Sequence, residues 1–192
     1  MPSLRSGARA GLALLMVAAA AAGCASPGAS LPEMTAGAAD AYRLDTGDEV
    51  RLTVFQQEEI SGTYRVNDSG DISLPLVGGV DAEGLTSDEL EGAVEASLSE
   101  GLLRDPNVSV EITSFRPFYI LGEVEDPGQY PYAPGMTVLT AAAVAGGFTY
   151  RAETDYVSVT RPDETGEPEE YRADRAQPIR AGDVIYVFER FF

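Results

Sequence analysis

The sequence has a single cysteine, no histidine and no lysine among its 192 residues. Without histidine, neither a Ser-His-Asp nor a Cys-His triad can form, and a zinc site built from histidine or several thiolates is excluded as well. One cysteine cannot form a disulfide within the chain. The catalytic arrangement that remains open is a pair of carboxylates. We expect no metal, no cofactor and no enzymatic activity.

Basic residues are also few: 13 arginines stand against 31 acidic residues, for a net charge of −18. Without residues 1–23 the net charge is −20, which repels nucleic acid and anionic lipid headgroups, so neither is an expected partner. We attribute the lack of lysine to genomic base composition. The acidity has two interpretations that stay open: a carboxylate-lined lumen past which an anionic polymer slides, or a saline habitat and general solubility.

The one cysteine, Cys24, directly follows an apolar run that begins at Gly11. Arg5 and Arg9 precede this run, so the segment has the charged, apolar and small-residue regions of a signal peptide. The run is too short for a membrane-spanning helix, which needs about 20 residues. The segment resembles a bacterial lipobox, with Ala21 at the usual leucine position, and this implies that Cys24 is acylated. The alternative is ordinary secretory cleavage that leaves Cys24 as a free thiol.

Residues 24–41 are small and contain proline, which predicts a flexible tether between this anchor and a folded body. A first module is expected over residues 42–116. Alternating apolar residues predict a strand at 50–54, and segments 64–66 and 72–74 flank a turn typical of a hairpin. Thr86 and Glu89 form the capping box of a helix that ends at Gly101, and a strand follows from residue 108.

A second module is expected over residues 117–192. It begins with an apolar strand at 118–122, and a turn at 126–128 follows. Thr137 is the expected cap of a helix over 138–145, residues 156–160 and 170–172 flank an acidic hairpin tip, and the last strand covers 184–188. This order is typical of a β-grasp-like sheet with one helix across it. We therefore predict an α+β fold of two small β-rich modules, each with one helix.

Residues 44–52 and 179–187 share one pattern: apolar-x-x-Gly-Asp-x-apolar-x-apolar. Glycine permits a tight turn, and the aspartate carboxylate can accept backbone amides of the turn that it follows. Taken alone, two independent turn-to-strand junctions explain the repeat.

In context, residues 42–55 resemble the opening of the polysaccharide export domain of Wza-type outer-membrane lipoproteins. The resemblance continues through Gly-x-Ile-x-x-Pro-x-x-Gly at 70–78, Gly-Leu-Thr at 84–86 and Asp-Pro-x-Val at 105–108. Residues 118–188 resemble a soluble-ligand-binding β-grasp module. The resemblance implies that the motif residues set turns and subunit contacts. These residues are Gly47, Asp48, Gly70, Pro75, Gly78, Asp105, Pro106, Gly122, Pro127, Gly128, Gly146, Gly147, Gly182 and Asp183.

The resemblance also implies an octamer-like ring of identical subunits on the periplasmic face of the outer membrane, anchored there by lipid on Cys24. Such a ring conducts a polysaccharide chain and works with an inner-membrane polysaccharide copolymerase. The type member continues into a C-terminal amphipathic helix that lines the pore, whereas this sequence stops at Phe192, directly after the last predicted strand. We therefore expect a periplasmic collar and a separate outer-membrane pore protein, of the β-barrel kind.

Two other functions are alternatives to the ring. The first is a monomeric periplasmic sugar-binding lipoprotein whose tyrosines stack on sugar rings, although aromatic residues in such strands are more often part of the core. The tyrosines concerned are Tyr119, Tyr130, Tyr132, Tyr150 and Tyr156. The second is a glycosidase or lyase that uses two carboxylates. The whole series of motifs, in one order behind a lipobox, favours the ring.

Overall fold

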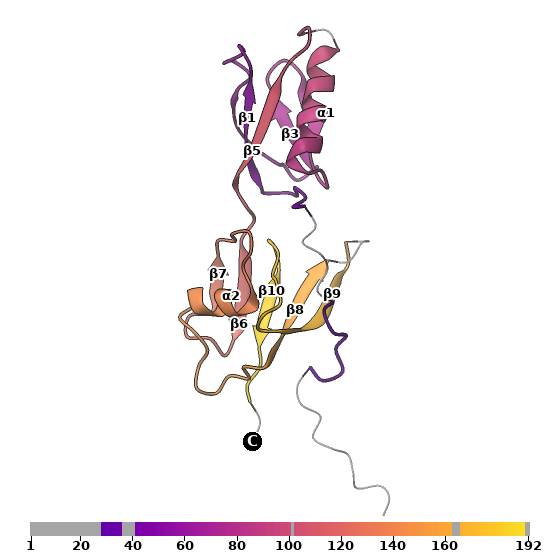
Figure 1. The fold of residues 1–192 in the computed structure, drawn as a ribbon. Helices are drawn as coiled ribbons and strands as arrows, with labels where there is room; N and C mark the ends of the chain where they lie inside the picture. Colours follow the sequence, from indigo (N-terminus) through magenta and orange to yellow (C-terminus); the bar gives the residue numbers. More distant parts are fainter. Residues whose placement is uncertain (1–27, 36–40, 101, 163–165, 191–192) are drawn as a thin grey trace, which may run out of the picture.

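The computed structural model describes residues 28–35, 41–100, 102–162 and 166–190. They form two modules stacked end to end, and β5 of the first runs through residues 115–117 into β6 of the second (Figure 1). The two helices and several sheets confirm the predicted α+β class. Cys24 lies outside the described residues, and so do the hairpin-tip residues 163–165. No helix in the described part of the chain is long and apolar enough to cross a membrane.

The first module packs one helix against two small sheets. One sheet has the order β2-β1-β5, with antiparallel neighbours, and the other is the antiparallel pair β3-β4. Its elements are β1 (Glu49–Val54), β2 (Gly62–Arg65), β3 (Asp71–Leu74), β4 (Gly78–Asp81), α1 (Ser87–Ser99) and β5 (Val108–Ser114).

Helix α1 begins and packs as its sequence predicts. The Thr86 hydroxyl accepts the Glu89 amide at 3.2 Å, and the Glu89 carboxylate accepts the Thr86 amide at 2.8 Å. This reciprocal capping satisfies two backbone donors that the helix itself cannot. Leu90, Val94 and Leu98 recur every four residues and are fully buried in the first core.

Two glutamates that flank the buried face of α1 protect the open edge of β5. The Glu95 carboxylate accepts the Val108 amide at 3.0 Å, and the Glu91 carboxylate accepts the Val110 amide at 2.8 Å. Unpaired amides along an edge strand would otherwise invite another chain. The three glutamates of α1, Glu89, Glu91 and Glu95, thus have structural partners in addition to solvent.

The hairpin predicted between residues 64–66 and 72–74 is wrong. A turn does form, because the Asn67 side chain accepts the amides of Ser69 and Asp71 at 2.8 and 3.1 Å. Beyond it, however, β2 pairs with β1 whereas β3 pairs with β4. The turn signal was correct, but β3 pairs with the next strand in the chain, β4, and Ile72, Leu74 and Val80 of this pair are buried in the first core.

The second module packs one helix on a mixed sheet of five strands in the order β7-β6-β10-β8-β9. The central pair, β6 and β10, is parallel, with Tyr119 beside Val184 and Leu121 beside Tyr186. The predicted hairpin of β8 and β9 is confirmed. The elements are β6 (Phe118–Gly122), β7 (Gly128–Tyr130), α2 (Val138–Val144), β8 (Tyr156–Pro162), β9 (Pro168–Asp174) and β10 (Val184–Val187).

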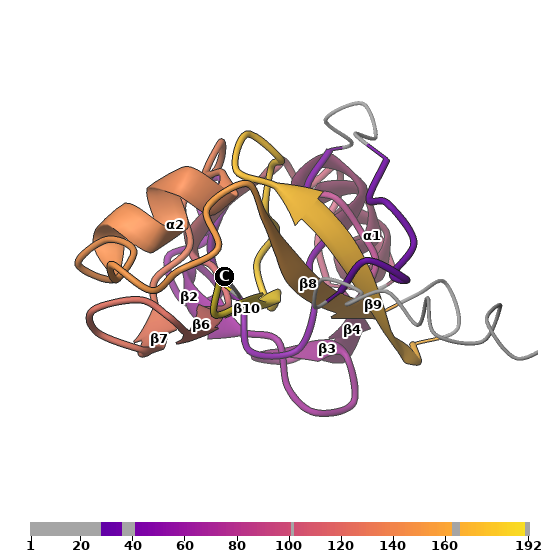
Figure 2. The same cartoon turned by 90° about the horizontal axis from the view of Figure 1, so that it is seen from below.

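Only one face of this sheet is covered by α2, as Figure 2 shows from below. Val138, Ala141 and Ala142 of the helix are buried with Ile120 and Ile185 of the central strands. Because side chains alternate along a strand, the residues between these point away from the helix. On that second face the large side chains of Tyr119, Leu121 and Tyr186 are therefore available to solvent.

Part of the segment predicted as a tether lies along the second module instead. The Met34 amide donates to the Arg172 carbonyl, and the Arg172 amide donates to the Pro32 carbonyl, both at 2.8 Å. The segment thereby extends the sheet past β9, whose outer edge otherwise has unpaired backbone groups. Gly28 lies against the Phe188 ring, so closely that a Cβ there would be 2.9 Å from it.

Candidate functional site at the module junction

The first Gly-Asp turn leads into β1, the central strand of its sheet. The Asp48 amide donates to the Asp45 carbonyl at 3.1 Å, and Gly47 between them has φ of 95°. This left-handed conformation is one that glycine adopts without strain. The Asp48 carboxylate then accepts the Asp45 amide at 2.9 Å, which closes the turn from its side-chain end.

The second Gly-Asp turn repeats this geometry before β10. The Asp183 amide donates to the Arg180 carbonyl at 3.2 Å, and Gly182 has φ of 85°. The Asp183 carboxylate accepts the Arg180 amide at 2.6 Å. The predicted role of the aspartate, to accept an amide of the turn that it follows, is confirmed in both modules.

Asp183 is bound by an arginine from its own module. The Arg161 guanidinium on β8 donates from Nε to Oδ1 at 2.9 Å and from Nη2 to Oδ2 at 2.7 Å. This two-pronged geometry is the strongest that a guanidinium and a carboxylate form. The Asp183 side chain is 1% exposed and the Arg161 side chain 17%, so water screens the pair little.

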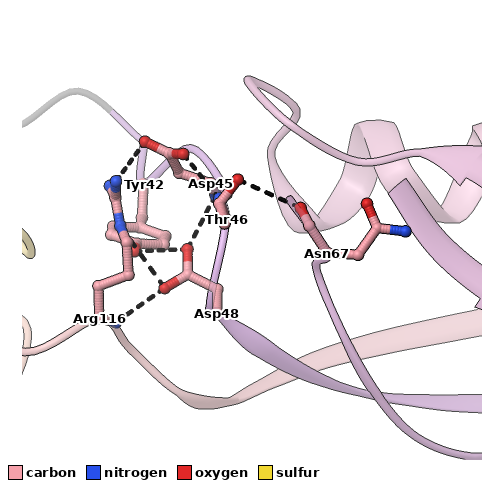
Figure 3. Close-up of polar contacts among 6 residues, drawn as sticks. All are labelled: Tyr42, Asp45, Thr46, Asp48, Asn67 and Arg116. Carbon is pink, nitrogen blue, oxygen red and sulfur yellow. Dashed lines mark hydrogen bonds and ion pairs between the residues drawn. The ribbon is translucent and has the colours of Figure 1, made fainter. Parts of the chain in front are cut away.

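Asp48 is bound by groups that converge from both ends of its module (Figure 3). The Tyr42 hydroxyl donates to its Oδ2 at 2.7 Å, and the Arg116 backbone amide donates to its Oδ1 at 2.8 Å. The Arg116 Nε is 3.8 Å from the same Oδ1, and the guanidinium forms an ion pair with Asp45. A fully buried carboxylate thus fixes the position at which the first module ends.

Arg116 lies between the two turns. A Cβ on Gly47 would be 3.8 Å from the Arg116 Cγ, and a Cβ on Gly182 would be 3.7 Å from the guanidinium carbon. The Gly182 amide also donates to the Pro117 carbonyl at 3.1 Å. The two motifs that are far apart in the sequence therefore meet at one place, which we call the Arg116 junction: Tyr42, Asp45, Gly47, Asp48, Arg116, Gly182 and Asp183.

Three aromatic rings pack beside the Arg116 junction. Phe115 contacts Tyr42 and Tyr132 edge to face, with ring centroids 4.9 and 5.7 Å apart. Burial, together with the hydrogen bond to Asp48, raises the pKa of the Tyr42 phenol well above its usual range. Burial and the nearby Asp183 carboxylate raise the pKa of Tyr132 as well. Both phenols therefore stay protonated at neutral pH and contribute donors and packing surface.

The other predicted motif residues lie away from this junction. Gly122 ends β6 with φ of 84°, and a Cβ there would be 2.1 Å from the Val187 carbonyl oxygen, so only glycine fits. The Gly147 carbonyl accepts the Glu125 amide at 3.0 Å, which joins the end of α2 to the turn after β6. The remaining motif residues lie in turns and strand ends: Gly70, Pro75, Gly78, Asp105, Pro106, Pro127, Gly128 and Gly146.

Sequence reasoning missed the arginines that complete the two turns. The sequence pattern marks Arg116 only as the end of the first module, and it does not mark Arg161. An aspartate in a buried turn needs a cationic or donor partner, but nothing local says which of the 13 arginines supplies it. The position of Arg116 immediately before Pro117 was the one available signal.

Two other kinds of site, a metal site and a ligand pocket, have little support in the described residues. Among the described residues, no group of three acidic or cysteine side chains is arranged to hold a metal ion. A hollow of about 160 Å³ lies where the N-terminal segment meets β8 and β9. Its lining is polar and includes Glu33, Asp155, Arg172 and Asp174, and the Arg172 guanidinium covers the Tyr156 ring at 4.1 Å.

Comparison with known proteins assigns both modules. Residues 36–113 match the family model described as "Polysaccharide biosynthesis/export protein", and residues 117–173 match the SLBB domain. The exopolysaccharide production protein ExoF of Rhizobium meliloti (strain 1021) is 36% identical over 156 residues, which are 72% of this chain and 36% of that protein. The polysialic acid transport protein KpsD of Escherichia coli is 28% identical over 108 residues, 55% of this chain and 19% of KpsD.

The fold and the two matched domains define a two-module protein of the polysaccharide export class. The chain belongs to the polysaccharide export protein family. It spans 36% of the length of ExoF and 19% of the length of KpsD. The matched regions meet between residues 113 and 117, where Arg116 lies.

Proposed function

We propose that this protein is a non-enzymatic, lipid-anchored ring component of a polysaccharide export machine. In this proposal identical copies form a periplasmic collar at the outer membrane, through which a polysaccharide chain passes toward a separate pore protein. An inner-membrane copolymerase delivers the chain to the collar. The names of the relatives support a role in exopolysaccharide production or polysaccharide transport.

The observation that carries the proposal is the Arg116 junction between the two matched domains. A conduit built from copies of a two-module chain requires that both modules keep one relative orientation in every copy. The buried Asp48 carboxylate holds the Arg116 amide at 2.8 Å, and Arg116 in turn lies against Gly182. In this proposal the two modules therefore form one rigid elongated unit (a short rod), which is a suitable building block for a ring.

The N-terminal segment supports an orientation for the rod. Gly28 packs on Phe188, which follows β10 at the end of the second module away from the first. Cys24 precedes Gly28 by four residues, and four residues span at most about 14 Å. A lipid on Cys24 would thus hold the far end of the second module next to the membrane, with the first module directed into the periplasm.

Native mass spectrometry of the full-length protein, purified in gentle detergent, tests the ring. We expect one closed oligomer of fixed copy number. A uniform monomer at micromolar concentration would contradict the ring and leave a monomeric binding protein.

Export and anchoring are tested in the cell with Cys24→Ser, which removes the acylation site and leaves the described residues unchanged. We expect the variant to leave the membrane fraction, to remain folded, and to restore little polysaccharide secretion to a deletion strain. Normal membrane association and normal secretion by this variant would contradict the lipid anchor.

A further inference from the structure

The second module has two apolar surfaces on opposite sides. On the sheet face away from α2, Tyr119 and Leu121 of β6 and Tyr186 of β10 are between 41 and 47% exposed. The register places Leu121 beside Tyr186 and Tyr119 beside Val184, so these side chains form one continuous patch. We call these four residues the open sheet face.

The opposite surface is the outer side of α2. Leu139 and Val144 are 49 and 50% exposed there, and Thr140 and Ala143 lie between them on the exposed side of the helix. These four residues are the outer helix face. Helix α1 of the first module provides the contrast, because four of its 13 residues are acidic whereas α2 has no charged residue.

The N-terminal segment protects the other half of the same sheet face. Phe188 packs beside Tyr156 with ring centroids 5.9 Å apart, and Gly28 contacts Phe188 in turn. Tyr156 and Ser158 of β8 are accordingly buried, although they point away from α2. The open sheet face over β6 and β10 is thus the part that the described chain leaves uncovered.

The distribution of charge indicates that a second copy of this chain covers the two apolar patches. Two copies of a chain with net charge −18 repel each other wherever their acidic surfaces approach. Strands β6, β7 and β10 and helix α2 contain no charged residue, so copies can approach at these elements without placing carboxylates against each other. Two different apolar patches on opposite sides of one body form a head-to-tail contact, which closes into a ring when the rotation permits.

We infer that the outer helix face of one copy packs on the open sheet face of the next copy, and that this contact builds the ring. The inference rests on the proposed function and adds to it the two surfaces that meet. Tyrosine at the centre of an interface contributes a large contact area with little loss of conformational freedom. Tyr119 and Tyr186 are therefore the expected centre of the contact.

Cross-linking of the full-length protein tests the pairing of the two faces. Leu121→Cys and Val144→Cys are made as separate proteins. The two are dissociated, mixed, allowed to reassemble and then treated with a short bismaleimide. We expect cross-links between the two variants and none within either alone, because head-to-tail packing keeps identical positions apart. The chain with both substitutions should give a ladder of products up to the closed ring. The parent chain, whose one cysteine is Cys24, and Phe55→Cys in the first module are the controls.

Charge insertion gives an independent measurement. Tyr186→Glu and Val144→Glu each place an unpaired carboxylate in the proposed contact, and we expect each to raise the concentration for half-assembly at least about tenfold. Phe55→Glu, at a side chain that is 69% exposed in the first module, should leave assembly unchanged. Circular dichroism on each variant checks that the fold is retained.

The remaining outcomes separate this inference from the proposed function. Cross-linked dimers from Leu121→Cys alone would mean that two sheet faces meet, and would overturn the head-to-tail contact. A ring that persists in both glutamate variants would mean that the subunit contact lies elsewhere. The proposed ring would then be retained and this inference overturned. Glutamate variants that keep the oligomeric mass of the parent and lose polysaccharide binding would mean that the open sheet face binds the polysaccharide. A monomeric parent would contradict the ring.

Discussion

The two Gly-Asp turns have the same backbone geometry and different partners. Asp183 takes its guanidinium from Arg161, a strand neighbour in its own module, through two hydrogen bonds. Asp48 takes a phenol from Tyr42 and a backbone amide from Arg116, the residue at which the chain leaves the module. One turn is completed within its module, whereas the other is completed by the linker.

This difference shows how a repeated motif acquires a second role. In both modules the aspartate closes a turn before the central strand, so its first role is local folding. Only in the first module does the carboxylate also hold the segment that connects the modules. Substitutions at Asp183, Asp48, Arg116 and Tyr42 separate these roles.

Asp183→Asn should cost about 3 kcal/mol of unfolding free energy, because it leaves the Arg161 guanidinium without its carboxylate partner at a largely buried position. The loss should appear as faster hydrogen exchange at β10 and β8 and as a lower urea midpoint. Glu189→Gln is the matched control, since it breaks the exposed Arg151–Glu189 pair and should cost less than about 1 kcal/mol. Equal losses in the two variants would contradict the special position of Asp183.

Asp48→Asn should cost about 2 kcal/mol, less than Asp183→Asn, because its partners are mainly neutral donors at 2.7 to 2.9 Å. Its effect should extend further, however, and accelerate exchange both at β1 and at the linker amides 115–117. Hydrogen exchange with mass spectrometry resolves these segments. A response confined to β1 would mean that Asp48 has only the local role.

Arg116→Met should cost about 1 kcal/mol and act on the relation between the modules, since both turns keep their own backbone hydrogen bonds. We expect a larger radius of gyration in small-angle scattering and faster proteolysis between residues 113 and 118. Methionine retains much of the side chain's volume, so lost packing contributes little. Arg65→Met, which removes the exposed pair with Glu49, is the control and should leave the scattering curve unchanged.

The sequence was informative where neighbouring residues determine the structure. The capping box of α1 and the Gly-Asp turns depend on groups within four positions of each other, and the predicted bonds form. Pairing between strands that are far apart in the sequence could not be predicted from neighbouring residues. Strand β1 pairs with β5, which follows it only after β2, β3, β4 and α1, and Pro32 and Met34 pair with Arg172 on β9.

The junction belongs to the same class of long-range information. Gly47, Asp48, Gly182 and Asp183 were all identified from the repeated pattern, but their meeting around Arg116 required the folded linker. The same holds for the open sheet face. Alternation in β6 and β10 fixes which residues share a side, whereas only packing decides that α2 covers one side and leaves the other to solvent.

The two turns also differ in their expected response to pH. Tyr42 donates to Asp48, and among the described residues the Asp183 carboxylate has no corresponding phenol donor. Because the pKa of Tyr42 is raised in the folded state, the unfolded chain loses this proton first as pH rises past about 10. The stabilisation is therefore complete below that pH and declines above it.

Tyr42→Phe should consequently cost about 1 kcal/mol at pH 7, where the hydroxyl donates to a charged acceptor, and less at pH 10.5. Urea unfolding of both proteins at the two pH values measures this, and the other tyrosines cancel because both proteins share them. Exchange at β10 should not respond, since the second turn is completed by Arg161. A difference near zero at both pH values would mean that Tyr42 contributes through its ring, which phenylalanine retains against Phe115, and that the two turns differ less than their partners indicate.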